Sequence, residues 1–212
     1  MFSTYSIYQI GVRLFWIAGF TLAFLSPKLE LHQLLNTYHN SFLDTLAKYS
    51  THIGDGLFFS LLILVFLFIS LKTSLLLFVS FVTSSAISQF LKHGVFPDVM
   101  RPMYYFQHDP NFHQIADFNY HFSTSFPSGH ATSCFALFTL LALTYSGKKT
   151  LQIVFLLAAI LFSFTRVYLS QHFFQDILAG SVIGTFVAQY AYQYLNPFVE
   201  KWNYSILNRP QK

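Results

Sequence analysis

Charged side chains are scarce in this sequence of 212 residues. Asp, Glu, Lys and Arg together account for 9% of it, whereas hydrophobic residues account for 54%. Soluble domains carry about 25% charged residues, and a chain this apolar would expose a large hydrophobic surface to water. The composition therefore excludes a water-soluble domain and predicts a membrane protein. Its 27 Phe and 13 Tyr residues are typical of lipid-facing surfaces and interfacial aromatic belts.

Cysteine is almost absent, and charge of one sign is not concentrated in any segment. The single cysteine, Cys134, excludes an internal disulfide and a site built from several thiolates, so we expect a buried thiol. The net charge of +4 comes from basic residues scattered along the chain. Because no basic run of the kind that binds nucleic acid is present, we expect no nucleic-acid partner.

Six apolar runs divide the chain, each close to the length that crosses a bilayer. They cover residues 8–25, 56–71, 74–91, 129–146, 150–165 and 173–195, and Asn196-Pro197 is expected to end the last run. The connection 26–55 carries leucines at helical spacing and is expected to lie along the membrane surface. We predict an all-α polytopic membrane protein, a single domain over residues 1–212 with six transmembrane helices in a bundle.

The basic residues indicate an orientation. Lys72, Lys148, Lys149 and the basic tail fall at one end of a six-span bundle, while the polar loops with all nine histidines fall at the other. Positive charge favours the cytoplasmic side, which predicts that both termini are inside. The small size and short loops favour a bacterial protein. We therefore expect an inner-membrane protein whose polar loops face the periplasm or the exterior.

The stretch from Phe164 to Asp176 places ionisable side chains between two apolar runs. If the chain is helical from about Gln171, His172 and Asp176 stand one turn apart on the same face. The carboxylate would then engage one ring nitrogen and leave the other free to attack, while Arg166 would hold the attacked anion. The same residues also fit a helix start whose polar side chains only face water.

Two further polar clusters fall at the same side of the membrane. Lys92 and Arg101, together with Arg166, supply three cations that suit a phosphate group better than a neutral substrate. We therefore expect an active site at one membrane face, where the three clusters meet.

Pro127-Ser128-Gly129-His130 opens the fourth apolar run. Ser128 is a good N-cap, and Gly129 lets an anion approach the free N–H groups of the first turn. In that turn His130 is placed to act as a general acid. A simple cap for Ser128 and a structural role for His130 are the alternatives.

Taken together, these residues resemble the three signature motifs of the type 2 phosphatidic acid phosphatases. That family is the membrane branch of a superfamily that includes the vanadium haloperoxidases. The motifs read here Lys92…Arg101-Pro102, Pro127-Ser128-Gly129-His130 and Arg166-x5-His172-x3-Asp176. Two positions depart from the family pattern. Eight residues separate Lys92 from Arg101 where the family usually has six, and Thr165 stands where the family commonly has Ser.

The resemblance implies a two-step phosphatase mechanism that requires no metal and no other cofactor. His172 would attack phosphorus and form a phosphohistidine while Asp176 orients its ring. His130 would protonate the leaving group and then activate the water that hydrolyses the intermediate. The phosphoryl oxygens would be held by the remaining motif residues, Lys92, Arg101, Ser128, Gly129 and Arg166.

The other histidines of the long polar loop do not form a recognisable ligand set. The spacings of His93, His108, His113 and His121 match no standard metal site. We expect these side chains to be solvated or to contact the head group of a lipid.

The sequence thus predicts an integral membrane lipid phosphatase that removes a terminal phosphate from a lipid phosphate or diphosphate. A phosphotransferase that passes the phosphoryl group to a lipid or sugar acceptor fits the same residues. A non-catalytic anion-binding protein or transporter is a further alternative, although transport sites lie nearer the membrane midplane. The identity of the lipid and the oligomeric state do not follow from the sequence.

Overall fold

Helices make up all the regular secondary structure in residues 6–208, the part of the chain that the computed structural model describes. The helices, in order, are α1 (Ile7–Leu25), α2 (Lys28–Asn36), α3 (Ser41–Ser50), α4 (Gly56–Leu67), α5 (Leu71–Phe90), α6 (Pro102–Phe106), α7 (Gly129–Thr144), α8 (Lys149–Tyr168) and α9 (Phe174–Val199). Short turns of other helix types are η1 (Thr51–Gly54), η2 (Leu91–Val95) and η3 (Glu200–Trp202). The prediction of an all-α protein is confirmed.

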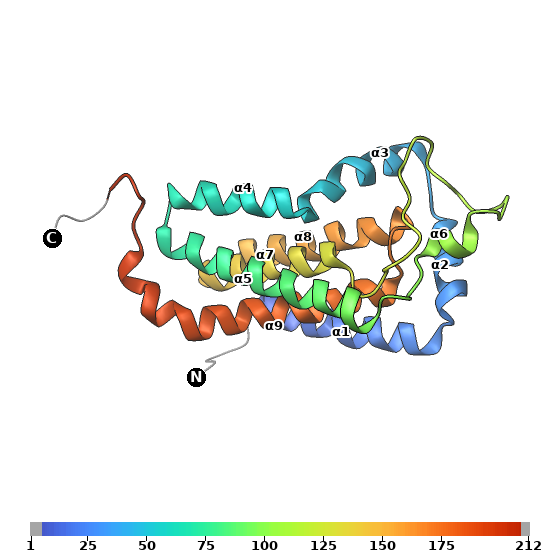
Figure 1. Cartoon of the computed structure of the whole chain (residues 1–212). Coiled ribbons are helices and arrows are strands. Elements are labelled where there is room, and N and C mark those ends of the chain that lie inside the picture. Colours follow the sequence, from blue (N-terminus) through green and yellow to red (C-terminus); the bar gives the residue numbers. More distant parts are fainter. Residues whose placement is uncertain (1–5, 209–212) are drawn as a thin grey trace.

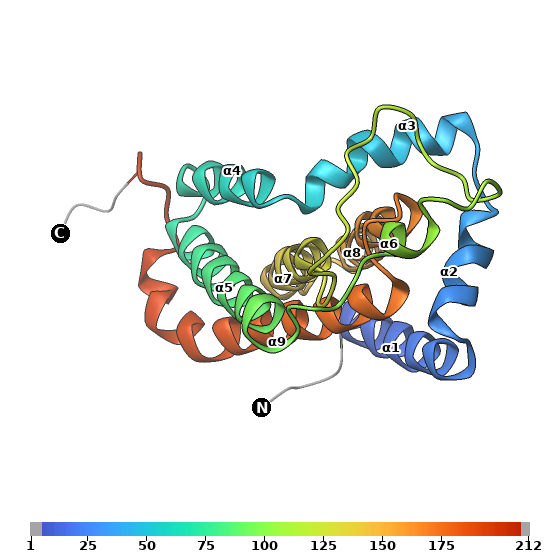
Figure 2. The same cartoon turned by 45° about the vertical axis from the view of Figure 1, so that its right-hand side comes forward.

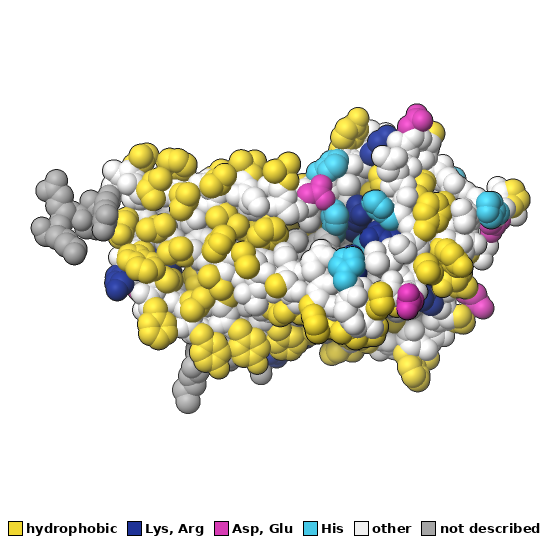
Figure 3. Space-filling view, in the orientation of Figure 1, with side chains coloured by type: hydrophobic (Ala, Val, Ile, Leu, Met, Phe, Trp, Pro, Cys, Tyr) yellow, Lys and Arg dark blue, Asp and Glu magenta, His cyan; other side chains and the backbone are white. Residues whose placement is uncertain are grey.

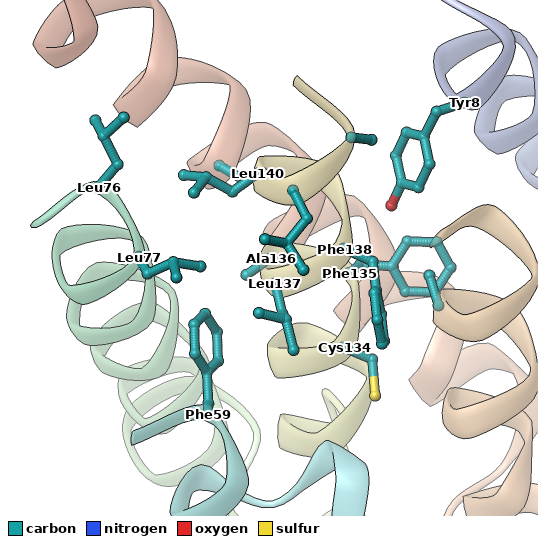
Figure 4. Packing of buried hydrophobic residues seen from close by; sticks show 14 of the residues in the cluster. Tyr8, Phe59, Leu76, Leu77, Cys134, Phe135, Ala136, Leu137, Phe138 and Leu140 are labelled. Carbon is teal, nitrogen blue, oxygen red and sulfur yellow. The ribbon is translucent and has the colours of Figure 1, made fainter. Parts of the chain in front are cut away.

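Helix α7 lies at the centre of the bundle, between α5, α8 and α9 (Figures 1 and 2). Most of its residues are buried, as expected for a helix that packs on every side. Figure 4 shows its side chains Phe135, Leu137 and Leu140 packed among residues from neighbouring helices. Cys134 is buried in the same core, which confirms the expected buried thiol.

The backbones of α7 and α9 approach each other closely because α9 carries two glycines on the shared face. A Cβ atom on Gly180 would lie 2.5 Å from the carbonyl oxygen of Ser128, and one on Gly184 would lie 2.3 Å from that of Thr132. Real side chains do not tolerate such distances, so only glycine fits at these two positions. This contact also fixes the position of the first turn of α9 relative to the first turn of α7.

Three helical segments are long and apolar enough to cross a bilayer. They are α1, α5 continued through η2, and α8. A fourth candidate is the pair formed by Ser41–Gly54 and Gly56–Leu67, which is bent by 54° and is either a broken span or a re-entrant loop. The described residues therefore show three to four candidate spans. Large hydrophobic side chains cover the long part of the molecule, and polar ones gather at one end (Figure 3).

All three polar clusters expected to converge lie at the same end of the bundle. The connection 26–55 forms α2, α3 and η1 there, beside the loop that carries α6 and beside the junction of α8 and α9 (Figure 1). The turn between α4 and α5 and the turn between α7 and α8 lie at the opposite end.

The predicted end of the last helix at Asn196-Pro197 was wrong. Helix α9 continues to Val199 with Pro197 inside it. Proline lacks one N–H, and near the end of a helix this removes a single backbone hydrogen bond, which packing can outweigh.

Replacement of Gly184 by Ala is expected to lower the free energy of unfolding by about 1–3 kcal/mol, because the new methyl group must push α9 away from α7. The measurement is thermal unfolding of the purified protein in detergent. Gly147→Ala is the matched control, since a Cβ at Gly147 would have no neighbour within 4 Å. Equal melting temperatures for the two variants would contradict the close-packing argument.

Candidate active site

A polar cavity of about 390 Å³ opens at the end of the bundle where the clusters meet. Figure 3 shows Lys, Arg and His side chains gathered in this hollow, next to an acidic side chain. Six of the predicted site residues line it: Lys92, Arg101, Gly129, His130, Arg166 and His172. The structure therefore brings residues from all three motifs around one space.

Ser128 and Asp176 lie beneath the cavity wall and are fully buried. The Ser128 hydroxyl accepts a hydrogen bond from the Ala131 amide at 3.4 Å and so acts as the N-cap of α7. The Ser128 amide donates to the Asp176 carbonyl oxygen at 3.0 Å. The two motifs thus contact each other directly, and the side chain of Ser128 supports the first turn of α7 from below.

His172 precedes α9, so the condition of a helix from about Gln171 is not met, whereas the run expected from residue 173 agrees with the start of α9. The helix starts at Phe174, because the Asp176 carboxylate accepts a hydrogen bond from the Phe173 amide at 2.9 Å and so stabilises the first turn. Even so, His172 Nδ1 and Asp176 Oδ2 lie 3.4 Å apart. This is longer than an ordinary hydrogen bond.

The same carboxylate oxygen of Asp176 accepts a hydrogen bond from Ser125 Oγ at 2.5 Å. Ser125, a residue that the sequence did not single out, thereby holds the carboxylate behind His172. Burial lowers the pKa of His172 well below its usual range; the charges of Arg101 and Arg166 act in the same direction, and Asp176 opposes them. The imidazole is therefore neutral near pH 7, which is the state that can attack phosphorus.

Gln171 joins the two arginines of the cavity. Its side-chain oxygen accepts from Arg101 Nη1 at 3.2 Å and from Arg166 Nη2 at 3.5 Å, and its backbone oxygen accepts from Arg101 at 3.1 Å. Its side-chain nitrogen, Nε2, donates to the backbone carbonyl oxygen of Asn119. One neutral side chain thus holds two like charges side by side. The sequence prediction missed Gln171, whose only signal was its place next to His172.

None of the three cavity cations forms an ion pair with a carboxylate within residues 6–208. Lys92, Arg101 and Arg166 are nevertheless buried. Burial lowers the pKa of Arg101, although the nearby Asp176 opposes this, and an arginine stays charged at neutral pH. Buried cations without a partner are costly, so an anion in the cavity would offset that cost.

Lys92 reaches the cavity despite the unusual spacing of the first motif. It lies in η2, a π-helical turn that extends α5. A π-turn uses about one residue more per turn than an α-helix, so it takes up part of the extra length before Arg101. The longer spacing therefore does not move Lys92 out of the site.

Asp55 is a further residue of the site that sequence reasoning missed. Its Oδ1 atom lies 2.5 Å from His130 Nε2, and its Oδ2 atom lies 2.7 Å from His52 Nδ1. Asp55 belongs to the connection that was expected to lie on the membrane surface. The only signal in the sequence was the polar run His-Ile-Gly-Asp-Gly just before an apolar segment.

Of the four loop histidines, only His121 lines the cavity. Burial lowers its pKa, and the positive charges of Arg101, Arg166 and Lys92 act in the same direction. His113 instead contacts the Asp44 carboxylate at 3.1 Å, away from the site. Within the described part of the chain, no three His, Cys, Asp or Glu side chains are grouped so as to hold a metal ion.

A family model described as PAP2 superfamily matches residues 73–200, which include all three motifs. The chain belongs to the PAP2 superfamily. This confirms the resemblance seen in the motifs and, with the apolar helices, the prediction of a membrane-embedded protein.

Two PAP2 relatives come from Arabidopsis thaliana. Lipid phosphate phosphatase 1 is 42% identical over 91 residues, which are 36% of this chain and 28% of the relative. Probable lipid phosphate phosphatase 4 is 40% identical over 86 residues, which are 35% and 28% of the two chains. The chain thus matches just over a quarter of the length of these relatives.

Two solved structures share the PAP2 fold. Aquifex aeolicus LpxE superposes with a TM-score of 0.65 at 22% identity, over 79% of this chain and 95% of that one. The transmembrane PAP2 type phosphatidylglycerolphosphate phosphatase from Bacillus subtilis gives a TM-score of 0.67 at 22% identity, over 89% and 96%. At this level of identity the likeness concerns the fold.

Replacement of Gln171 by Leu is expected to weaken binding of orthovanadate about 10- to 100-fold. The reason is that two hydrogen bonds to charged groups are lost and the arginines can move apart, at about 1.5–3 kcal/mol for such a bond. Calorimetric titration of the purified protein measures the affinity. Gln107→Leu, on an exposed part of the same polar loop system, is the control. Unchanged affinity in Gln171→Leu would show that Gln171 does not organise the anion site.

Proposed function

We propose that this chain is an integral membrane lipid phosphatase. It hydrolyses a terminal phosphate ester or diphosphate of a lipid through a phosphohistidine on His172. The observation that carries the proposal is the cavity itself. There, three buried cations with no carboxylate partner in the described part of the chain surround a neutral histidine backed by a carboxylate. The PAP2 membership and the names of the Arabidopsis relatives support the same activity.

In the first step the Nε2 atom of His172 attacks phosphorus, because Nδ1 faces Asp176. An N–P bond forms and the P–O bond to the lipid breaks. His130 donates a proton to the departing oxygen. The guanidinium groups of Arg101 and Arg166, the Lys92 ammonium and the N–H groups at the start of α7 stabilise the charge on the phosphoryl oxygens.

In the second step water attacks the phosphohistidine. His130, now neutral, takes a proton from that water as the O–P bond forms and the N–P bond breaks. Inorganic phosphate leaves, and both histidines return to their starting states. The groups that attack and transfer protons in both steps, His172 and His130, line the cavity.

The position of the cavity suits a lipid substrate. One wall is formed by α5, which is a candidate membrane span, through Phe81, Ser85 and Ser88. Exposed apolar side chains such as Leu57 and Val82 lie on the adjoining helices α4 and α5. A lipid can therefore keep its chains in the bilayer while its phosphate enters the cavity at the membrane boundary.

The proposal includes the finer features expected from the sequence. These are one domain over residues 1–212, six crossings of a bacterial inner membrane, and a site that faces the periplasm or exterior. Helices α7 and α9, which flank the catalytic histidines, would then be the two crossings beyond the four candidates.

Replacement of His172 by Ala is expected to reduce phosphate release by at least about 10³-fold, because the nucleophile is lost. The assay uses purified protein with phosphatidic acid, phosphatidylglycerolphosphate, lipid A and a polyprenyl diphosphate, each with and without an acceptor lipid. His108→Ala, a loop histidine outside the cavity, should behave like the wild type. Turnover retained by His172→Ala would refute the nucleophile assignment.

The rate of phosphoenzyme formation is expected not to decline as the pH falls through 6.5, the ordinary pKa of histidine, and to decline only well below it. The sign follows because the attacking imidazole must be neutral, and burial keeps it neutral to lower pH. Single-turnover trapping of labelled phosphoenzyme between about pH 8 and pH 5 measures this. An acidic limb centred at 6.5 or above would contradict a buried, neutral His172.

A further inference from the structure

The segment that joins η1 to α4 contacts the catalytic residues from outside the three motifs. Asp55 touches His130 at 2.5 Å, and Thr51 Oγ1 accepts a hydrogen bond from Arg166 Nη1 at 3.0 Å. One short turn therefore reaches both the general acid and a phosphate-binding arginine. Neither contact was expected from a connection lying on the membrane surface.

We propose that Asp55 is a positioning residue that forms a second carboxylate–imidazole pair with His130. The segment 51–56 then acts as a fourth element of the active site. The inference rests on the proposed phosphatase function and deepens it, because it says how the proton-transferring histidine is oriented.

The two pairs use opposite nitrogens of their rings. His172 presents Nδ1 to Asp176, whereas His130 presents Nε2 to Asp55. A carboxylate accepts a proton from the nitrogen it faces and so selects one tautomer. The pairing therefore leaves Nε2 of His172 for attack on phosphorus and Nδ1 of His130 for proton transfer.

The side chain of Asp55 does not cap helix α4, although its position is one where an aspartate usually does so. Asp55 occupies the N-cap position of α4, where an aspartate usually accepts hydrogen bonds from the first-turn amides. Here it makes no cap hydrogen bond, and its two oxygens contact His130 and His52 instead. A residue that served only to start α4 would be oriented the other way.

Glycine at position 54 permits this approach. A Cβ atom on Gly54 would lie 3.2 Å from His130 Cδ2 and 3.0 Å from Cys134 Sγ. These distances are tighter than nearly all real Cβ contacts, so a larger residue would move the turn away from α7. The short distance between Asp55 and His130 thus depends on the absence of a side chain next to Asp55.

Charge balance gives the pair a second role. Burial disfavours the protonated form of His130, and the positive charges of Arg166 from α8 and Lys92 from η2 act in the same direction. Asp55, whose other oxygen contacts His52, is the carboxylate in contact with the ring. It therefore helps His130 to carry the proton that the first step consumes.

The test compares Asp55→Asn with the wild type in phosphate release. We expect kcat to fall about 10- to 100-fold with KM changed less than about threefold, since proton transfer by a positioned group contributes on this order. The limb of the pH profile that His130 controls should move to lower pH, because loss of the carboxylate disfavours the imidazolium. Asp55→Glu should restore part of kcat, and Asp98→Asn, an exposed loop carboxylate, should match the wild type.

Two results would overturn the proposal. One is an Asp55→Asn enzyme with wild-type kcat and an unshifted pH profile. The other is a loss that remains undiminished when His130 is already replaced by Ala, because a residue that acts through His130 has no effect once that ring is gone. If Asp55→Asn does not fold, the wild type alone still tests the pairing, because a His130 proton on Nδ1 instead of Nε2 would overturn it.

A spectroscopic measurement decides the point without any substrate. In protein labelled with ¹⁵N-histidine, the His130 ring signals are assigned by comparison with His130→Ala. The wild type should hold the proton on Nε2, and Asp55→Asn should populate both tautomers. An unchanged tautomer would overturn the role of Asp55, whereas absence of phosphate release from the wild type would count against the proposed function alone.

Discussion

The close contact between α7 and α9 is the constraint on which the site depends. Gly180 and Gly184 let the two backbones meet, and the Ser128 amide then reaches the Asp176 carbonyl oxygen. Because His130 stands in the first turn of α7 and His172 just before the first turn of α9, this contact places both histidines on one cavity. A wider separation would part the proposed nucleophile from the proposed general acid while leaving both helices intact.

The charges that line the cavity favour the binding of an anion. Lys92, Arg101 and Arg166 are buried and have no carboxylate partner among residues 6–208, and Gln171 holds the two arginines together with its neutral oxygen. The carboxylates that do reach the site, Asp55 and Asp176, are each directed at a histidine. In the proposed mechanism the cations are thus left for the substrate, and the carboxylates orient the histidines that attack and transfer protons. Such preorganised charge is worth most where water is excluded.

The same arrangement explains why the site lies at the end of the bundle. The core around α7 is built from hydrophobic side chains, and burying a charge among them would be costly. Polar residues can gather only where the helices end and connecting segments cover them. There the connection 26–55, the long loop and the α8–α9 junction enclose a space that opens beside lipid-facing helices. A site at this end leaves the apolar core intact and, under the proposed function, lets a lipid held in the bilayer reach the cavity.

The sequence by itself determined the helical class, most helix boundaries to within a few residues, the buried cysteine and the family. These follow from local pattern, because hydrophobic runs and motif spacings are properties of neighbouring residues. The roles of Asp55 and Gln171 were decided only by tertiary structure, because their partners are brought to them by packing rather than by spacing. Likewise, only the tertiary structure shows that α9 continues through Pro197. It also shows the bend between α3 and α4, on which the number of membrane crossings depends. Contacts between residues distant in the chain depend on how helices pack, and no local signal records them.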